Sequence, residues 1–77
     1  MIPVRVLIGR AVIQARQRAG LSQRALAKLA DCSQTTIYHI ENGSHAVALE
    51  NAYRIAQVCE VPFTELFKEL DALERLP

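Results

Sequence analysis

The chain has 77 residues, of which 51% are hydrophobic and 22% are charged. This length fits one globular domain over residues 1–77, because a second core would need roughly 50 more residues. Three glycines, three prolines and two cysteines exclude a collagen-like repeat, a Pro/Gly-rich disordered chain and a disulfide-stapled module. Its apolar runs are far shorter than the ~20 residues that cross a bilayer, so we expect a soluble, cytoplasmic protein.

The net charge of +1 conceals an uneven distribution along the chain. Residues 1–30 contain six lysines and arginines and no acid, whereas residues 31–77 contain three basic and eight acidic side chains. A basic half can bind a polyanion while an acidic half faces away or meets a partner. A chance split among solvated surface residues is the alternative explanation.

Two helices are predicted in the basic half. Apolar residues recur at three- and four-residue steps from Val4 to Ala19 and predict an amphipathic helix. This helix ends at Gly20, because glycine readily adopts the left-handed conformation that closes a helix. The Ser22 hydroxyl can then cap a short second helix, which runs to Ala30.

A third short helix follows after a tight break. Asp31 is one of the few residue types besides glycine that tolerate a left-handed turn, and Ser33 is placed as the next N-cap. The third helix covers residues 34–41 and ends at Asn42-Gly43 in a second glycine cap. Residues 22–41 thus form a helix, a turn of a few residues and a second helix, which is the helix-turn-helix arrangement.

Two further helices complete the prediction. The fourth starts near Leu49 and carries apolar residues to Cys59, and Pro62 can occupy the first position of a fifth helix over residues 62–74. Strand-like alternation is absent from the sequence. We therefore expect an all-α, compact five-helix bundle.

The exposed face of the third helix is polar but uncharged. Its side chains can all form hydrogen bonds to base edges or phosphates: Gln34, Thr35, Tyr38 and His39. An ordinary solvated helix face is the alternative, but surface helices more often carry lysine and glutamate. In a helix-turn-helix, the second helix can lie in the DNA major groove.

The sequence resembles a known family in several segments at the correct spacing. Leu26-Ala27, Ile37 and Glu41-Asn42-Gly43 resemble the helix-turn-helix domain of phage repressors, Cro proteins and the wider Xre group. Further similarity, in the first helix and in the fourth and fifth helices, extends the resemblance to about residues 7–67. It implies a lambda-repressor-like DNA-binding fold.

The resemblance also implies a role for individual side chains. Base contacts fall to Gln34, Thr35 and His39, with Tyr38 near a base or a phosphate. The phosphate contacts implied by the resemblance or expected from charge are Gln23, Arg24, Arg10, Lys28, Asn42 and Ser44. Arg16 and Glu41 occupy positions that pair as an internal salt bridge in the family.

The chain departs from the family pattern at a few positions. The family usually has glycine where Asp31 stands and glutamate where Ala25 stands. A Pro-Ser pair is common where Val47-Ala48 stands, so the fourth helix lacks a good side-chain cap. The third helix also lacks the arginine that most often reads guanine.

Enzymatic and metal chemistry find no support in the residue pattern. Cys32 and Cys59 have no ligand partner at a zinc-like spacing, and we interpret both as small hydrophobic residues. His45 is expected on a surface loop. A catalytic Cys-His or Ser-His pair would need a third orienting group and a pocket. We expect a protein that is not an enzyme and has no cofactor, metal or small-molecule effector.

The predicted last helix carries an apolar stripe longer than one small core needs. Its predicted dimer contacts are Phe63, Leu66, Phe67, Leu70 and Leu73, and intramolecular packing is the alternative. We therefore expect a homodimeric, sequence-specific transcriptional regulator, a repressor or autoregulator, that binds double-stranded DNA at a roughly palindromic operator. The alternative function is a protein-binding adaptor that retains the fold and uses its acidic half to hold a partner.

Overall fold

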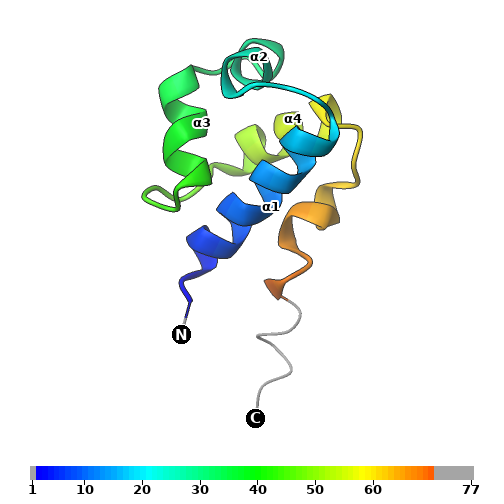
Figure 1. The fold of residues 1–77 in the computed structure, drawn as a ribbon. Helices are drawn as coiled ribbons and strands as arrows, with labels where there is room; N and C mark the ends of the chain where they lie inside the picture. The colour runs from blue at the N-terminus through cyan, green and yellow to red at the C-terminus, as the bar shows by residue number, and fades with distance from the viewer. Residues whose placement is uncertain (1, 71–77) are drawn as a thin grey trace.

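The computed structural model describes residues 2–70 and is entirely helical within them (Figure 1). The elements are α1 (Val4–Arg18), α2 (Gln23–Leu29), α3 (Gln34–Glu41), α4 (Leu49–Val58) and the 3₁₀-helix η1 (Phe63–Phe67). The predicted all-α class and the extent of α3 are confirmed. The prediction of five α-helices is wrong, because the fifth element is a short 3₁₀-helix.

The predicted helix over residues 62–74 is the element that differs most. Pro62 provides no side-chain cap, and Phe63-Thr64 are an aromatic and a β-branched residue of modest helix propensity. The Glu65 N–H donates to the Pro62 carbonyl at 2.9 Å, which is the i to i+3 bond of a 3₁₀ turn. Residues 71–74 of the predicted helix lie outside the described residues.

The same capping motif ends all four α-helices. After α1, the Leu21 N–H donates to the Arg16 carbonyl while Gly20 adopts a φ of 73°, which is a Schellman motif. Gly43 ends α3 in the same way. Asp31 and Glu60 take the equivalent position after α2 and α4, each with a φ of 57°. The predicted turn at Asp31 is thus confirmed, although its backbone conformation is one that glycine adopts at lower cost.

Side-chain caps explain where the two short helices begin. The Ala25 N–H donates to the Ser22 hydroxyl oxygen at 3.0 Å, and the Thr36 N–H donates to Ser33 at 3.1 Å. Both predicted N-caps are therefore confirmed. Ala48 precedes α4 without a side-chain cap bond, as the missing Pro-Ser pair predicts.

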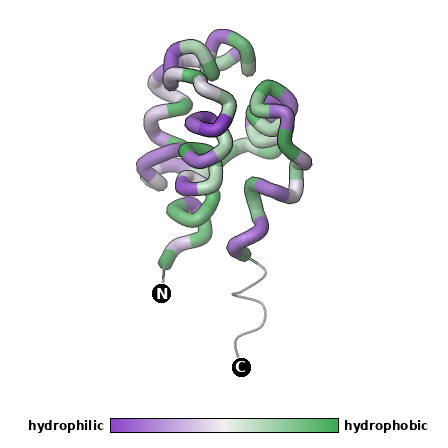
Figure 2. The backbone as a smooth tube through the Cα atoms, turned by 45° about the vertical axis from the view of Figure 1, so that its right-hand side comes forward, coloured by the Kyte–Doolittle hydropathy of each residue, from purple (hydrophilic) through white to green (hydrophobic). Residues whose placement is uncertain are grey.

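One hydrophobic core joins the helices. Its fully buried large side chains are Leu26, Ile37, Ile55, Leu66 and Val12. Each helix carries both hydrophobic and hydrophilic residues along its length (Figure 2). The hydrophobic ones recur at helical spacing, so that one face of each helix packs in the core. Helices α3 and η1 pack on opposite sides of α1 (Figure 1). Within residues 2–70, no helix combines the length and the apolar character that spanning a membrane requires.

Gly9 allows α1 and α3 to approach closely. A Cβ atom at residue 9 would clash with the Ile40 carbonyl oxygen and would lie 2.8 Å from the Glu41 carbonyl oxygen. Both obstacles are backbone atoms, which cannot rotate away as a flexible side chain can. Only glycine fits this crossing without displacing the end of α3.

Candidate nucleic-acid interface

A buried ion pair fixes α3 against α1. The Arg16 Nε and Nη2 atoms donate to the two carboxylate oxygens of Glu41 at 2.7 and 3.0 Å. The Glu41 side chain is only 4% exposed and that of Arg16 is 15% exposed. This hydrogen-bonded carboxylate raises the pKa of the Arg16 guanidinium, so the arginine stays charged.

Gln23 joins the same network from the first turn of α2. Its Nε2 atom donates to Glu41 Oε1 at 3.0 Å. A side-chain amide nitrogen carries two hydrogens, so the second one is available to an external acceptor. The residue expected to bind phosphate is therefore oriented by a carboxylate that also holds α1.

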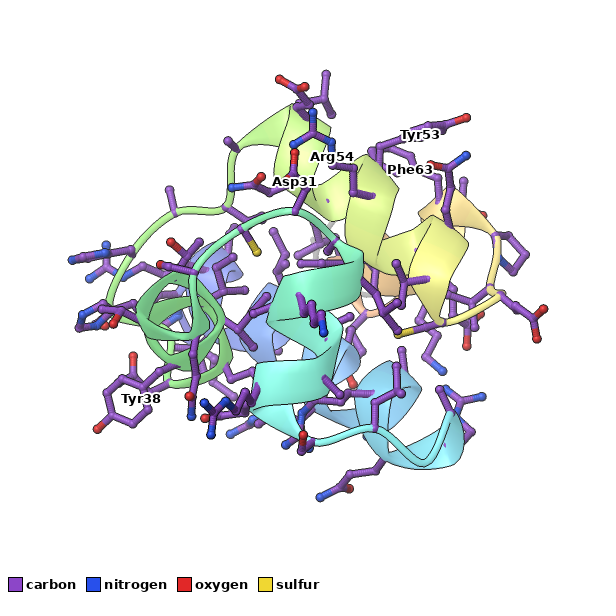
Figure 3. The ribbon with its side chains drawn as sticks, turned by 90° about the horizontal axis from the view of Figure 1, so that it is seen from above. Asp31, Tyr38, Tyr53, Arg54 and Phe63 are labelled. Carbon is purple, nitrogen blue, oxygen red and sulfur yellow. The ribbon has the colours of Figure 1, made fainter. Side chains whose placement is uncertain are left out.

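The outer face of α3 forms a ridge between two shallow hollows. Gln34, Thr35 and Tyr38 are exposed on this ridge, and His39 is half-buried. One hollow lies towards α2 and is lined by Gln23, Gln34, Thr35 and Tyr38. The other lies towards α4 and is lined by Thr35, Thr36, His39, Ile40, His45, Ala46, Ala48 and Asn51. Tyr38 projects away from the body of the domain (Figure 3).

The loop after α3 is tied together internally. The Ser44 N–H and hydroxyl both donate to Asn42 Oδ1, at 2.9 and 2.5 Å. Both donors of Ser44 are thus used within the loop, and the Asn42 amide nitrogen is the better placed donor for a phosphate. Arg5 Nε holds the loop from α1 by donating to the Gly43 carbonyl at 2.7 Å.

Three of the expected phosphate ligands are exposed cations. Arg10, Arg24 and Lys28 lie on the surface, and none forms an ion pair with another residue of the described range. By contrast, Arg18 and Lys68 both contact Glu65. The uncompensated positive charge therefore comes from α1 and α2, the elements packed against α3.

The apolar stripe of the last helix is partly used inside the domain. Leu66 is only 1% exposed and belongs to the core, so its prediction as a dimer contact is wrong. Phe63, Phe67 and Leu70 are half-buried against the core, and Leu73 lies outside the described residues. The Tyr53 ring of α4 lies 6.2 Å from the Phe63 ring; both point away from the side that carries Tyr38 (Figure 3).

Both cysteines carry free thiols in hydrophobic surroundings. Cys59 is buried and Cys32 is half-buried. Burial raises the pKa of each thiol above its ordinary value, which leaves them protonated and unreactive at neutral pH. Within the described part of the chain, no three histidine, cysteine or acidic side chains are grouped as metal ligands.

Several contacts of this site were not anticipated from the sequence. Arg5 was not assigned a role, and His45 was placed on the surface without a partner, whereas its ring stacks on His39 at 4.3 Å. The hydrogen bond of Gln23 to Glu41 joins residues to which the sequence assigned separate roles, and that of Ser44 to Asn42 joins two expected phosphate ligands. The two histidines in residues 39–45 were the one available signal of the ring contact.

Comparison with known proteins identifies the family. The model of the helix-turn-helix family HTH_3 matches residues 12–66. The restriction-modification controller protein C.AhdI from Aeromonas hydrophila is 30% identical, with a TM-score of 0.78 over 82% of this chain and 96% of that one. These matches show that the chain belongs to the Xre-type helix-turn-helix family of DNA-binding transcription regulators.

Other solved structures share the fold. An HTH_3 family transcriptional regulator from Vibrio cholerae is 26% identical, with a TM-score of 0.80 over 91% of this chain and 39% of that one. The clp gene regulator ClgR from C. glutamicum is 19% identical, with a TM-score of 0.85 over the whole of both chains. Among curated proteins, none matches the chain.

Proposed function

We propose that this protein is a sequence-specific regulator that binds double-stranded DNA as a homodimer and represses transcription or regulates its own gene. The observation that carries the proposal is the ridge of α3. Gln34, Thr35 and Tyr38 are exposed hydrogen-bonding side chains, and the buried Arg16–Glu41 pair holds their helix in place. A rigid helix with such a face suits a major groove.

The charges around α3 support a division of labour. Gln34, Thr35, Tyr38 and His39 are proposed to contact bases. Arg10, Arg24, Lys28, Gln23 and Asn42 are proposed to contact the phosphate backbone on either side. Phosphate contacts fix the register of a protein on DNA, whereas contacts to base edges specify the sequence.

The proposed dimer forms through the surface of Tyr53, Phe63 and Phe67. These rings form a continuous aromatic row, with centroids 6.2 and 4.9 Å apart. The Tyr53 and Phe63 side chains point away from the Tyr38 side (Figure 3), so a second copy could bind there without covering α3. Two α3 helices about 34 Å apart, one turn of DNA, would then read a roughly palindromic site.

Selection from a random duplex library tests this function directly. We expect enrichment of an inverted repeat with half-sites about 10 base pairs apart, and an affinity for it that falls steeply with salt. A folded protein that enriches no sequence and binds all duplexes weakly would refute the proposal. That outcome would favour the adaptor function.

Three variants separate base readout from phosphate binding. Gln34→Ala should relax the preference at one operator position. Arg24→Ala should weaken binding to all sequences alike and flatten the salt slope by about one unit. Lys68→Ala is the matched control, because it also removes one positive charge, but from the η1 side, where Lys68 pairs with Glu65 at 2.8 Å. Equal effects of Arg24→Ala and Lys68→Ala would refute the assigned phosphate role.

A second pair of variants tests the dimer surface by sedimentation equilibrium. Tyr53→Glu introduces a charge on a side chain that is 54% exposed, and we expect it to weaken dimerisation by at least tenfold. Val4→Glu is the control, because Val4 is 51% exposed and lies in a different hollow, beside Ala46 and Val47. A dimer unaffected by Tyr53→Glu would contradict the proposed surface.

A further inference from the structure

The loop after α3 determines which nitrogen of His39 carries a proton. The Ser44 backbone N–H is shared between the His39 carbonyl at 3.1 Å and the Asn42 side chain at 2.9 Å. A side chain that accepts from an N–H presents its oxygen Oδ1 and not its amide nitrogen. The Ser44 hydroxyl donates to the same oxygen at 2.5 Å. Ser44 Oγ also lies 3.4 Å from the His39 carbonyl oxygen, which can only accept. A hydroxyl has one hydrogen, and these two oxygens share it, so Ser44 Oγ accepts in its contact with His39 Nδ1 at 3.1 Å.

The hydrogen therefore resides on Nδ1 when the His39 ring is neutral. A neutral imidazole has one N–H, so Nε2 is then a bare acceptor. Within residues 2–70, Nε2 has no hydrogen-bond partner. The ring is further held by the stacked His45 ring, 4.3 Å away and tilted by 31°, and by the edge of Tyr38 at 5.4 Å.

We propose that neutral His39 selects a base with a major-groove amino group, adenine or cytosine, by accepting a hydrogen bond at Nε2. The inference rests on the proposed function, in which α3 lies in the major groove. Adenine N6 and cytosine N4 are the hydrogen-bond donors that bases present there, whereas guanine and thymine present acceptors. Ser44 and Asn42 are then positioning residues, which set the base preference through the His39 tautomer.

Nuclear magnetic resonance of the free protein tests the tautomer without DNA. At about pH 8, where an unperturbed imidazole is neutral, long-range ¹H–¹⁵N spectra distinguish protonated from bare ring nitrogens. We expect Nδ1 of His39 to be protonated and Nε2 to be bare. Ser44→Ala should shift the population towards the other tautomer, and Ser44→Thr, which keeps the hydroxyl, should restore it. A wild-type His39 protonated at Nε2 would overturn the proposal.

Affinity for the selected operator and its variants tests the base preference. The position read by His39 is the one whose preference His39→Ala abolishes. There, at about pH 8, we expect adenine or cytosine to be favoured about five- to tenfold over guanine and thymine. Ser44→Ala should weaken this preference at this position alone.

The possible failures can be told apart. A guanine or thymine preference at about pH 8, in a protein that binds its operator specifically, would overturn the base assignment and leave the proposed function standing. A protein that binds no duplex would refute the proposed function and the reading role of His39 together. The tautomer measured in the free protein would still be known in that case.

Discussion

Replacing Glu41 with glutamine tests whether the buried ion pair is the element that holds α3 in place. The substitution preserves size but removes the charge and one of the two carboxylate oxygens that accept three hydrogen bonds, two from Arg16 and one from Gln23. The new amide nitrogen would also face donors. The Arg16 guanidinium, 15% exposed, would keep a charge that water reaches only in part.

The expected loss of stability is large for a chain of this size. Removing one partner of a buried pair costs about 3–5 kcal/mol. A 77-residue domain is typically stable by roughly 4–12 kcal/mol. A loss of about 3 kcal/mol would lower Tm by roughly 12–24 °C. Gln23→Ala removes only one donor from a half-exposed site, and we expect it to cost about 1 kcal/mol.

A double-mutant cycle separates the cost of breaking the pair from the value of having it. Each single change, Arg16→Met or Glu41→Met, leaves one group unpaired and should destabilise strongly. The double variant removes both charges, and we expect it to be more stable than either single variant, because replacing a whole buried pair by apolar side chains is often close to neutral. The coupling free energy should therefore be about 2–3 kcal/mol or more.

Urea unfolding followed by circular dichroism provides the free energies, with an unchanged m-value as the check that the unfolding transition is the same. A stabilising osmolyte keeps the weakest variants in the measurable range. If Glu41→Gln lowers the free energy of unfolding by less than about 1 kcal/mol, the Arg16–Glu41 pair contributes no more than an exposed ion pair does. That result would refute the reasoning. A double variant as unstable as the sum of its two single variants would refute it as well.

Three further predictions follow from the backbone and the thiols. Gly9→Ala should lower the free energy of unfolding by about 1–3 kcal/mol, measured by urea unfolding, because its Cβ would clash with the Ile40 and Glu41 carbonyls. An unchanged unfolding midpoint would show that α1 and α3 can accommodate the added methyl group, and would contradict this prediction. Asp31→Gly should stabilise by about 1 kcal/mol because Asp31 has a φ of 57°; a lower Tm would contradict this. Burial raises the pKa of the Cys59 thiol in the folded protein. The protonated thiol therefore contributes fully to the stability of the fold below the pKa that the thiol has in the unfolded chain. This contribution is lost as the pH rises towards the pKa of the thiol in the folded protein. Stability should accordingly fall above about pH 8.5 and fall less in Cys59→Ala, and identical slopes for the two proteins would refute the assignment.

Local signals explain why most helix boundaries could be predicted. Ser22 and Ser33 each accept a bond from the N–H three residues ahead, and Gly20 and Gly43 close their helices with positive φ. Both devices act over a few residues, so short stretches of sequence contain the required information. The same holds for Asp31, which was expected in a turn on residue type alone.

The last element shows where such local reasoning fails. The apolar spacing from Phe63 onward fits an α-helix, but Leu66 is drawn fully into the core between α1 and α4, and the chain forms a 3₁₀ turn after Pro62. Spacing alone does not reveal how much of an apolar stripe the same domain buries. For the same reason, Leu66 was predicted at a dimer surface that it does not reach.

The candidate site could be predicted as a set of positions but not as a set of atoms. The sequence placed Gln34, Thr35, Tyr38 and His39 on one face of α3. It did not show that the Ser44 hydroxyl donates its hydrogen bond to Asn42, because that bond depends on how the loop folds in three dimensions. Within a hydrogen-bond network, whether a group donates or accepts depends on what its neighbours do. The role of each group can therefore be assigned only when its neighbours are known.

This dependence ties the stability of the domain to its proposed reading of DNA. The end of α3 is held from one side by Glu41, which accepts from Arg16 and Gln23, and from the other by Arg5, which donates to Gly43. The Asn42–Ser44 loop that sets the His39 tautomer begins after the first attachment and contains the second. A substitution at Arg5 touches no proposed base-reading atom, yet it frees the loop that orients Ser44. We therefore expect Arg5→Ala to blur the base preference at the His39 position while leaving that at Gln34 intact, and selection from a random duplex library distinguishes this from a uniform loss of affinity.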